Sequence, residues 1–270
     1  MYPQSRVLII AGSDSSGGAG IQADIKTVTL LGSYAMTAVT AVTAQNTMGV
    51  KKITPIPKKN VQKQITMILD DIGADAVKIG MLHNVSIIKC VHHILKKYNL
   101  KNIVIDPVMV AKGGARLINN NSITYLKKLL LPLAKLITPN IPEAEVLSGC
   151  SISNKEDMIE AAKKIINMGP KNVLLKGGHL KSKMIFDILA TKKEIKVFPK
   201  RKIITKNTHG TGCTLSSALA TCLSQKKSIF KSCEISLKYV DRAITYAPGY
   251  GKGFGPLNHL VLFNLRNTNV

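Results

Sequence analysis

Short β-branched runs alternate along this chain with longer segments of helical periodicity, and this alternation constrains the fold more than any other feature. The predicted strands are residues 6–11, 36–44, 76–79, 103–105, 136–137, 173–175 and 185–189. The predicted helices are residues 20–31, 61–72, 85–98, 122–131, 155–168, 213–223 and 229–245. Strands that alternate with helices indicate βαβ units and a mainly parallel sheet. Because no repeat and no Pro/Ser-rich linker divides the sequence, we expect a single three-layer α/β/α domain over residues 1–270.

The composition is that of an ordinary globular protein. With 45% hydrophobic residues and a mean hydropathy of +0.12, the 270 residues can bury a large core. Apolar runs such as residues 7–11 are far shorter than the roughly 20 residues that cross a bilayer, so we expect a cytoplasmic protein without a membrane partner. The five cysteines lack C-x-x-C spacing, which argues against both a disulfide framework and a zinc site.

The formal net charge of +23 raises the question of nucleic-acid binding. The lysines that carry this charge are scattered along the whole chain, and arginine, the usual reader of phosphates and guanines, occurs only five times. With 4% aromatic residues and no Trp, few side chains could stack on bases. We therefore interpret the charge as a solvated surface and expect no nucleic-acid partner.

The first predicted strand runs into a glycine-rich stretch, GSDSSGGAG, at Gly12–Gly20. It matches neither the Walker pattern nor G-x-G-x-x-G, but glycines this dense let a backbone approach a ligand closely. Asp24 follows on the first turns of the next helix, where its carboxylate could hydrogen-bond a small polar molecule. The alternative is a flexible turn capped by Ser13 or Asp14.

Asp106 and Glu143 each follow a predicted apolar strand and each lie beside a proline. Carboxylates at strand ends can hold a hydrated Mg²⁺, although acidic residues near proline also mark turns and helix starts. Asn140 has the spacing of a cap for a helix that begins near residue 142. Lys176 ends a strand and Lys238 lies within a helix, and composition alone makes both surface lysines.

The stretch Gly210-Thr211-Gly212-Cys213 leads into a helix of small residues. Free backbone N–H groups and the positive end of a helix dipole favour an anion there, for example a transferring phosphoryl group. At the first helical position the pKa of the Cys213 thiol would fall, so Cys213 could act as a base. A cysteine that only packs in the interior is the commoner case, and the residues alone leave both interpretations open.

A set of motifs covers about residues 6–260 in a fixed order: AGSDSSGGAGIQADIKT, VTAQNT, KIGML, DPVM, ITPNIPEAE, LLKGGH, NTHGTGCTLSSALA and GKGFGP. In order and approximate spacing this set resembles the bacterial hydroxymethylpyrimidine/phosphomethylpyrimidine kinases of thiamine biosynthesis. The resemblance implies a ribokinase-like fold, a homodimer, and two successive ATP-dependent phosphorylations of 4-amino-5-hydroxymethyl-2-methylpyrimidine.

The resemblance also assigns roles at the phosphoryl-transfer centre. Cys213 matches the catalytic base, and Gly210, Thr211 and Gly212 match the anion hole. Asp106 and Glu143 match positions associated with Mg²⁺ and its water. Lys176 and Lys238 match residues near the ATP phosphates.

On the substrate side, the resemblance implies that Asp24 and Gln45 hydrogen-bond the aminopyrimidine. Met81 and Val108 match apolar walls of the pyrimidine pocket, and Gly12 is expected to line it. None of the matched positions departs from the family pattern.

Three other functions compete with this interpretation. A pyridoxal or pyridoxine kinase of the same fold would also phosphorylate a hydroxymethyl group on a polar aromatic ring, although Met81 and Gln45 favour the aminopyrimidine. A nucleic-acid-binding or regulatory protein would use the positive charge and show a steep salt dependence. A nicotinamide-dependent oxidoreductase would need the glycine fingerprint that the first loop lacks.

Overall fold

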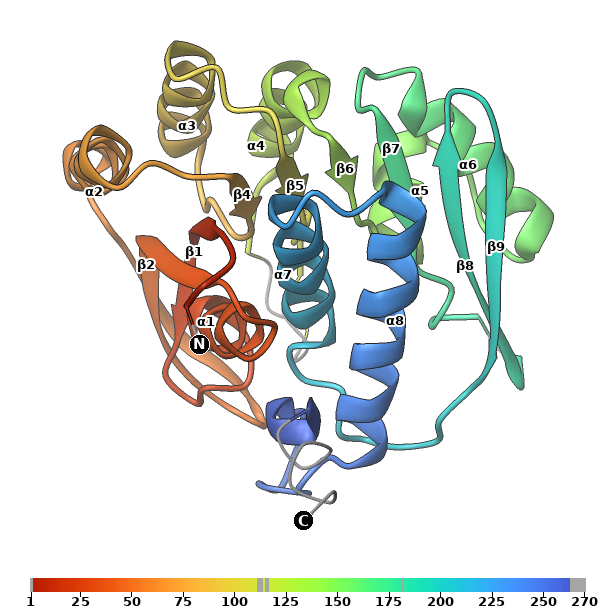
Figure 1. The fold of residues 1–270 in the computed structure, drawn as a ribbon. Helices are drawn as coiled ribbons and strands as arrows, with labels where there is room; N and C mark the ends of the chain where they lie inside the picture. Colours follow the sequence, from red (N-terminus) through yellow and green to blue (C-terminus); the bar gives the residue numbers. More distant parts are fainter. Residues whose placement is uncertain (1, 111–113, 115–116, 181, 263–270) are drawn as a thin grey trace.

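The computed structural model describes residues 2–110, 114, 117–180 and 182–262 (Figure 1). Within these residues one nine-stranded sheet has the order β3-β2-β1-β4-β5-β6-β7-β8-β9. The strands are β1 (Arg6–Asp14), β2 (Tyr34–Asn46), β3 (Gly49–Pro55), β4 (Ala76–Ile79), β5 (Ile103–Ile105), β6 (Leu136–Ile137), β7 (Asn172–Leu175), β8 (Met184–Thr191) and β9 (Ile195–Arg201). The run from β2 to β7 is parallel, while β3, β8 and β9 pair antiparallel at the two edges.

Helices cover both faces of the sheet (Figure 1). They are α1 (Gly20–Leu30), α2 (Lys58–Asp71), α3 (Val85–Lys97), α4 (Asn120–Tyr125), α5 (Ile141–Ser148), α6 (Lys155–Ile166), α7 (Thr211–Ser224) and α8 (Ile229–Thr245). Successive strand residues point to opposite faces, so Leu8 and Ile10 pack in the core formed with α2 to α6. Val7 and Ile9 pack in the second core, with α1, α7 and α8. The predicted three-layer arrangement is thus present.

The two strands that the sequence analysis missed are the edge strands β3 and β9. Their side chains are mostly half-buried or exposed, so neither strand carries the apolar run by which a buried strand is recognised. The predicted helix 122–131 is also different in the structure. After α4 the chain passes through a π-helical turn (Leu126–Leu130) and a 3₁₀ turn (Leu131–Leu133), where Pro132 cannot donate a helical hydrogen bond.

Asn140 caps helix α5 as predicted. Its side chain accepts a hydrogen bond from the Glu143 N–H, and the Glu143 carboxylate accepts one from the Asn140 N–H, both at 2.9 Å. This capping box fixes the direction in which the chain enters the helix. No helix in the described part of the chain is long and apolar enough to cross a membrane.

A buried histidine lies near the C-terminal end of the described chain. His259 begins a 3₁₀ turn (His259–Leu262), and its Nε2 lies 3.0 Å from the Thr214 hydroxyl of α7. The Tyr239 hydroxyl donates to the His259 carbonyl at 2.9 Å. Burial lowers the pKa of His259 to about 4, and the charge of Lys26 adds to the shift. The imidazole is therefore neutral in the folded protein.

We expect acid to destabilise the wild type more than a His259→Gln variant. The unfolded chain takes up a proton near pH 6.5 and the folded chain only near pH 4, so stability is lost as the pH falls through this window. At pH 5 the loss is about 2 kcal/mol. Urea unfolding at pH 7 and pH 5 measures it, because glutamine does not titrate. Equal losses in both proteins would show that His259 carries no such effect.

Candidate active site

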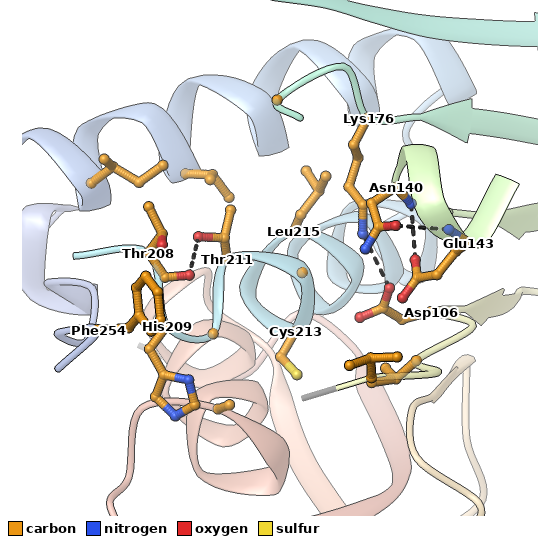
Figure 2. A pocket seen from close by; sticks show the side chains of 18 of the residues that line it. Asp106, Asn140, Glu143, Lys176, Thr208, His209, Thr211, Cys213, Leu215 and Phe254 are labelled. Carbon is orange, nitrogen blue, oxygen red and sulfur yellow. Dashed lines mark hydrogen bonds and ion pairs between the residues drawn. The ribbon is translucent and has the colours of Figure 1, made fainter. Parts of the chain in front are cut away.

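A cavity of about 830 Å³ opens at the edge of the sheet where the parallel strands end. Its walls come from the ends of β1 and β2, from the segments that follow β4, β5, β6 and β7, from β8 and β9, and from α8 and the start of α7. Figure 2 shows Cys213 at the start of α7, with Asp106, Glu143 and Lys176 grouped beside it. The topology thus gathers most of the predicted site residues in one place.

Close backbone contacts place the start of α7 between the first loop and the ends of the central strands. Gly210, the N-cap of α7, has a φ of 84°, and a Cβ atom there would lie 1.8 Å from the Gly18 carbonyl oxygen. A Cβ atom on Gly212 would lie 3.0 Å from Asp106 Oδ2 and 3.4 Å from Lys176 Nζ. Gly210 therefore leaves no room for a side chain, and a methyl group on Gly212 would crowd the ends of the Asp106 and Lys176 side chains.

The first turn of α7 offers backbone donors. The Thr214 N–H bonds the Gly210 carbonyl at 2.9 Å, so the N–H groups of Gly212 and Cys213 have no partner within the helix. The helix has neither a side-chain N-cap nor an acidic residue in its first turn. The Thr211 hydroxyl donates to the Thr208 carbonyl at 2.8 Å. These features are what the predicted anion hole at residues 210–212 requires.

Cys213 lies at the third position of α7, two residues later than the sequence analysis expected. The side chain is half-buried, and Gly20 at the start of α1 lines the same cavity. Burial raises the pKa of the thiol to about 12. Lys78 and the Gly20 N–H oppose the shift, and the charges of Asp24 and Asp106 add to it. The expectation of a lowered pKa was therefore wrong, because desolvation outweighs the helix dipole, and Cys213 is a thiol at neutral pH.

Two carboxylates and a lysine meet beside Gly212, at the ends of the central strands. Lys176 Nζ lies 3.2 Å from Asp106 Oδ1, and Figure 2 shows the Glu143 carboxylate facing Asp106. Burial raises the pKa of Glu143 to about 7. Lys176 and two backbone N–H groups oppose the shift, while Asp106 adds to it. Burial works against the charge of Lys176, but the charges of Asp106 and Glu143 outweigh it and raise the pKa of Lys176.

Asp106 and Glu143 fit a magnesium ion bound together with phosphates. Both side chains are buried, and the negative charge of Asp106 disfavours ionisation of Glu143, a repulsion that a cation would relieve. Among the described residues, no group of three or more His, Cys, Asp or Glu side chains is arranged to hold a metal. Mg²⁺ in phosphoryl-transfer sites takes only one or two carboxylates and fills its other positions with water and phosphate.

Most of the predicted pyrimidine-binding residues line one end of the cavity. Gly12, Gln45, Met81 and Val108 all do so. A Cβ atom on Gly12 would lie 2.4 Å from the terminal methyl of Met81, so this glycine makes room for the methionine. Gly12, Met81 and Val108 thus form an apolar slot, and the Gln45 amide lines the same cavity, 3.3 Å from His209 Nε2.

Asp24 does not line the cavity, so its predicted contact with the substrate is corrected. Its side chain has no exposed surface. One carboxylate oxygen lies 2.8 Å from Lys78 Nζ, and the other accepts a hydrogen bond from the Ser217 hydroxyl at 2.7 Å. A carboxylate enclosed in this way cannot reach a ligand.

Lys238 is also outside the cavity. Its side chain is exposed on α8, whereas the neighbouring Leu237, Val240 and Ile244 line the pocket and form an apolar surface. The predicted role of Lys238 near the ATP phosphates is therefore corrected, because the helix periodicity turns it away. Only residues at the spacing of 237, 240, 241 and 244 share the face that meets the cavity.

A cluster of charged side chains that the sequence analysis missed also lines the cavity. Lys200 Nζ lies 3.1 Å from Asp187 Oδ2 and 2.8 Å from Asp241 Oδ1. The Gly177 N–H donates to Asp187 Oδ1 at 2.9 Å. The cluster thus ties β9 and α8 to the loop that follows Lys176. Its members come from three separate segments, and no sequence pattern links them.

Asp14 and His209 form a second arrangement that sequence reasoning did not find. His209 Nε2 lies 2.7 Å from Asp14 Oδ2, and Asp14 also accepts hydrogen bonds from Ser16 and from the Ala19 N–H. Burial opposes ionisation of Asp14, but His209 and these hydrogen bonds outweigh it and lower its pKa to about 2. The pair thus connects the loop after β1 to the segment that leads into α7. The two residues are 195 positions apart, so their spacing carries no signal.

Comparison with known proteins identifies relatives in thiamine biosynthesis. A family model described as phosphomethylpyrimidine kinase matches residues 14–258. The thiamine biosynthesis bifunctional protein ThiED of Geobacter sulfurreducens is 48% identical over 260 residues, which are 96% of this chain and 53% of that protein. The chain thus spans about half of this relative's length. The hydroxymethylpyrimidine/phosphomethylpyrimidine kinase of Bacillus subtilis is 44% identical over 94% of both chains.

Solved structures of two kinds resemble the fold. A phosphomethylpyrimidine kinase from Clostridium difficile has a TM-score of 0.80 at 45% identity and covers 89% of this chain and 99% of its own. A pyridoxal kinase from Bacillus subtilis, solved as an ADP complex, has a TM-score of 0.89 at 38% identity and covers 96% and 99%. The predicted ribokinase-like fold is confirmed. The match over residues 14–258, together with these identities, shows that the chain belongs to the phosphomethylpyrimidine kinase family.

Proposed function

We propose that this protein transfers the γ-phosphoryl group of ATP to the hydroxymethyl group of 4-amino-5-hydroxymethyl-2-methylpyrimidine and then to the resulting monophosphate. The observation that carries the proposal is the start of α7. There, backbone donors, the Cys213 thiol and the Asp106–Lys176 pair meet between an apolar slot and a second apolar surface. One end of the cavity suits a flat heterocycle and the other a nucleotide base.

The chemistry follows from this arrangement. The slot at Gly12, Met81 and Val108 holds the pyrimidine ring, and Gln45 orients its polar edge. The N–H groups of Gly212 and Cys213 and the Lys176 ammonium stabilise the charge on the transferring phosphoryl group. Cys213, once deprotonated, takes the proton from the attacking hydroxyl.

Mg²⁺, held by Asp106 and Glu143 with ATP, is part of the proposal and would neutralise charge on the phosphates. We also propose one kinase domain over residues 1–270, a homodimer and a cytoplasmic location. The five free thiols agree with a reducing compartment. No nucleic-acid or membrane partner is part of the proposal.

Phosphorylation of pyridoxal is the second candidate. It is favoured by the pyridoxal kinase whose structure has a TM-score of 0.89 with this chain. Against it stand the relatives of higher identity, which are named for the pyrimidine activity. The slot can hold either ring, so the substrates have to be compared directly.

The test is a parallel assay of phosphoryl transfer from ATP with Mg²⁺ to the hydroxymethylpyrimidine, to its monophosphate and to pyridoxal, with products resolved by mass. We expect the pyrimidine diphosphate to form from both pyrimidines, with kcat/KM for pyridoxal at least tenfold lower. Omitting the pyrimidine is the control for ATP hydrolysis. Transfer to pyridoxal alone would replace the substrate assignment, and no transfer to any of the three would contradict the kinase activity itself.

A further inference from the structure

The buried lysine of β4 has no role in the chemistry described so far. Val77 and Ile79 face the core under α2 to α6, so Lys78 points to the opposite face of the sheet. Its partners in register there, Ile9 of β1 and Val104 of β5, belong to the apolar core under α1, α7 and α8. The Lys78 side chain has no exposed surface. A buried ammonium is a costly choice for a position that an apolar side chain would fill.

The ammonium is held in place by two helices. Lys78 Nζ lies 2.8 Å from Asp24 Oδ2 on α1, and Asp24 Oδ1 accepts a hydrogen bond from the Ser217 hydroxyl on α7 at 2.7 Å. All three side chains are fully buried. Both helices begin at the transfer centre, because Gly20 of α1 and Cys213 of α7 line the same cavity. The charge is thus fixed relative to the transfer centre.

Lys78 also lies beside the cavity. It contributes to the cavity wall, and a Cβ atom on Gly80 would lie 2.9 Å from its Nζ. Burial opposes the charged form, but the charges of Asp24 and Asp106 outweigh it and raise the pKa of Lys78. The lysine therefore stays a cation without touching solvent, and its field acts on the side of the cavity where Cys213 lies.

We propose that Lys78 is a positioning residue for phosphoryl transfer. Its buried ammonium, anchored by Asp24 and Ser217, supplies a fixed positive charge that stabilises the negative charge developing on the Cys213 sulfur and on the transferring phosphoryl group. A charge that is already oriented costs no reorganisation during the reaction. The inference rests on the proposed kinase function. It adds to that function a buried cation in the wall of the site.

Three variants separate this role from a purely structural one: Asp24→Asn, Lys78→Met and the double variant with both changes. All three have nearly the shape of the wild type. If the Lys78–Asp24 pair only stabilises the fold, the variants change the free energy of unfolding but leave kcat per folded molecule unchanged. If the cation acts in catalysis, Lys78→Met and the double variant lose about 10²-fold in kcat, and Asp24→Asn, which removes the carboxylate that holds the ammonium in place, also loses activity. KM for the pyrimidine should stay within about threefold, because Lys78 does not reach the substrate.

The double variant keeps the test decisive if Lys78→Met does not fold, since it leaves no unpaired charge in the interior. Urea unfolding reports the folded fraction of each protein. The exposed pair Arg6–Asp75, at the far end of β1 from the cavity, provides the control, and Arg6→Met with Asp75→Asn should leave kcat unchanged.

The outcomes discriminate clearly. Wild-type kcat in the folded double variant would overturn the role of Lys78 and leave the kinase function intact. A wild type that transfers no phosphate would overturn the proposed function itself.

Discussion

Replacing Cys213 by alanine is expected to remove the first phosphoryl transfer and to leave the second largely intact. In the first step the nucleophile is an alcohol, which has to lose a proton. In the second step it is a phosphate monoester, whose second pKa of about 6 leaves it without that proton at pH 7.5. A base contributes about 10² to 10⁴-fold where a proton has to move. We therefore expect a loss of at least about 10²-fold in kcat/KM with the hydroxymethylpyrimidine, and of less than about tenfold with its monophosphate.

The raised pKa of Cys213 adds a pH dependence to this prediction. In the free enzyme the thiol has a pKa of about 12, raised mainly by burial, so the thiolate fraction grows about tenfold for each pH unit between 7 and 9. Since kcat/KM reports on groups of the free enzyme, it should rise with pH for the first step and stay flat for the second. The rise should be absent in Cys213→Ala.

Cys222→Ala is the control, because Cys222 is a buried cysteine further along the same helix and does not line the cavity. It should leave both steps and their pH profiles as in the wild type. Equal losses of both steps in Cys213→Ala would show that the side chain shapes the site instead of moving a proton. Full activity in both steps would remove Cys213 from the mechanism.

The ribokinase-like fold could be predicted because the buried strands carry their own signal. The predicted strands 76–79, 103–105 and 136–137 agree with β4, β5 and β6 at both ends. These strands are covered on both faces, so each is a short run with few polar residues between loops. The edge strands β3 and β9 have no such run, and their pairing depends on neighbours that a local window does not contain.

The site could be predicted only in part, for a related reason. Motifs identified Cys213, Asp106 and Lys176 because each directly follows a strand or begins a helix, where topology decides the position. Whether a side chain is exposed to the cavity depends on packing from distant segments. The Asp24 carboxylate is enclosed by its hydrogen bonds with Lys78 and Ser217, which lie 54 and 193 residues further along the chain, and therefore does not reach the cavity.

Replacing Gly212 by alanine is expected to inactivate the enzyme without destabilising it. Gly212 is the second residue of α7 and has no positive φ, so alanine suits its backbone and favours the helix by up to about 1 kcal/mol. The new methyl group would lie 3.0 Å from Asp106 Oδ2 and 3.4 Å from Lys176 Nζ. It would thus occupy the space in which the transferring phosphoryl group meets the Gly212 N–H. Loss of such a donor costs about 10² to 10³-fold in kcat.

Gly178→Ala is the matched control, because Gly178 also lines the cavity but a Cβ atom there would have no neighbour within 4 Å. We expect it to keep kcat within about threefold, since nothing has to move. Urea unfolding should give Gly212→Ala at least the stability of the wild type, while the assay with the hydroxymethylpyrimidine and its monophosphate should show both steps lost. Both steps are affected because the same γ-phosphoryl group is transferred in each. An active Gly212→Ala enzyme would mean that the phosphoryl group does not pass over the first turn of α7, and the anion hole would have to be sought elsewhere in the cavity.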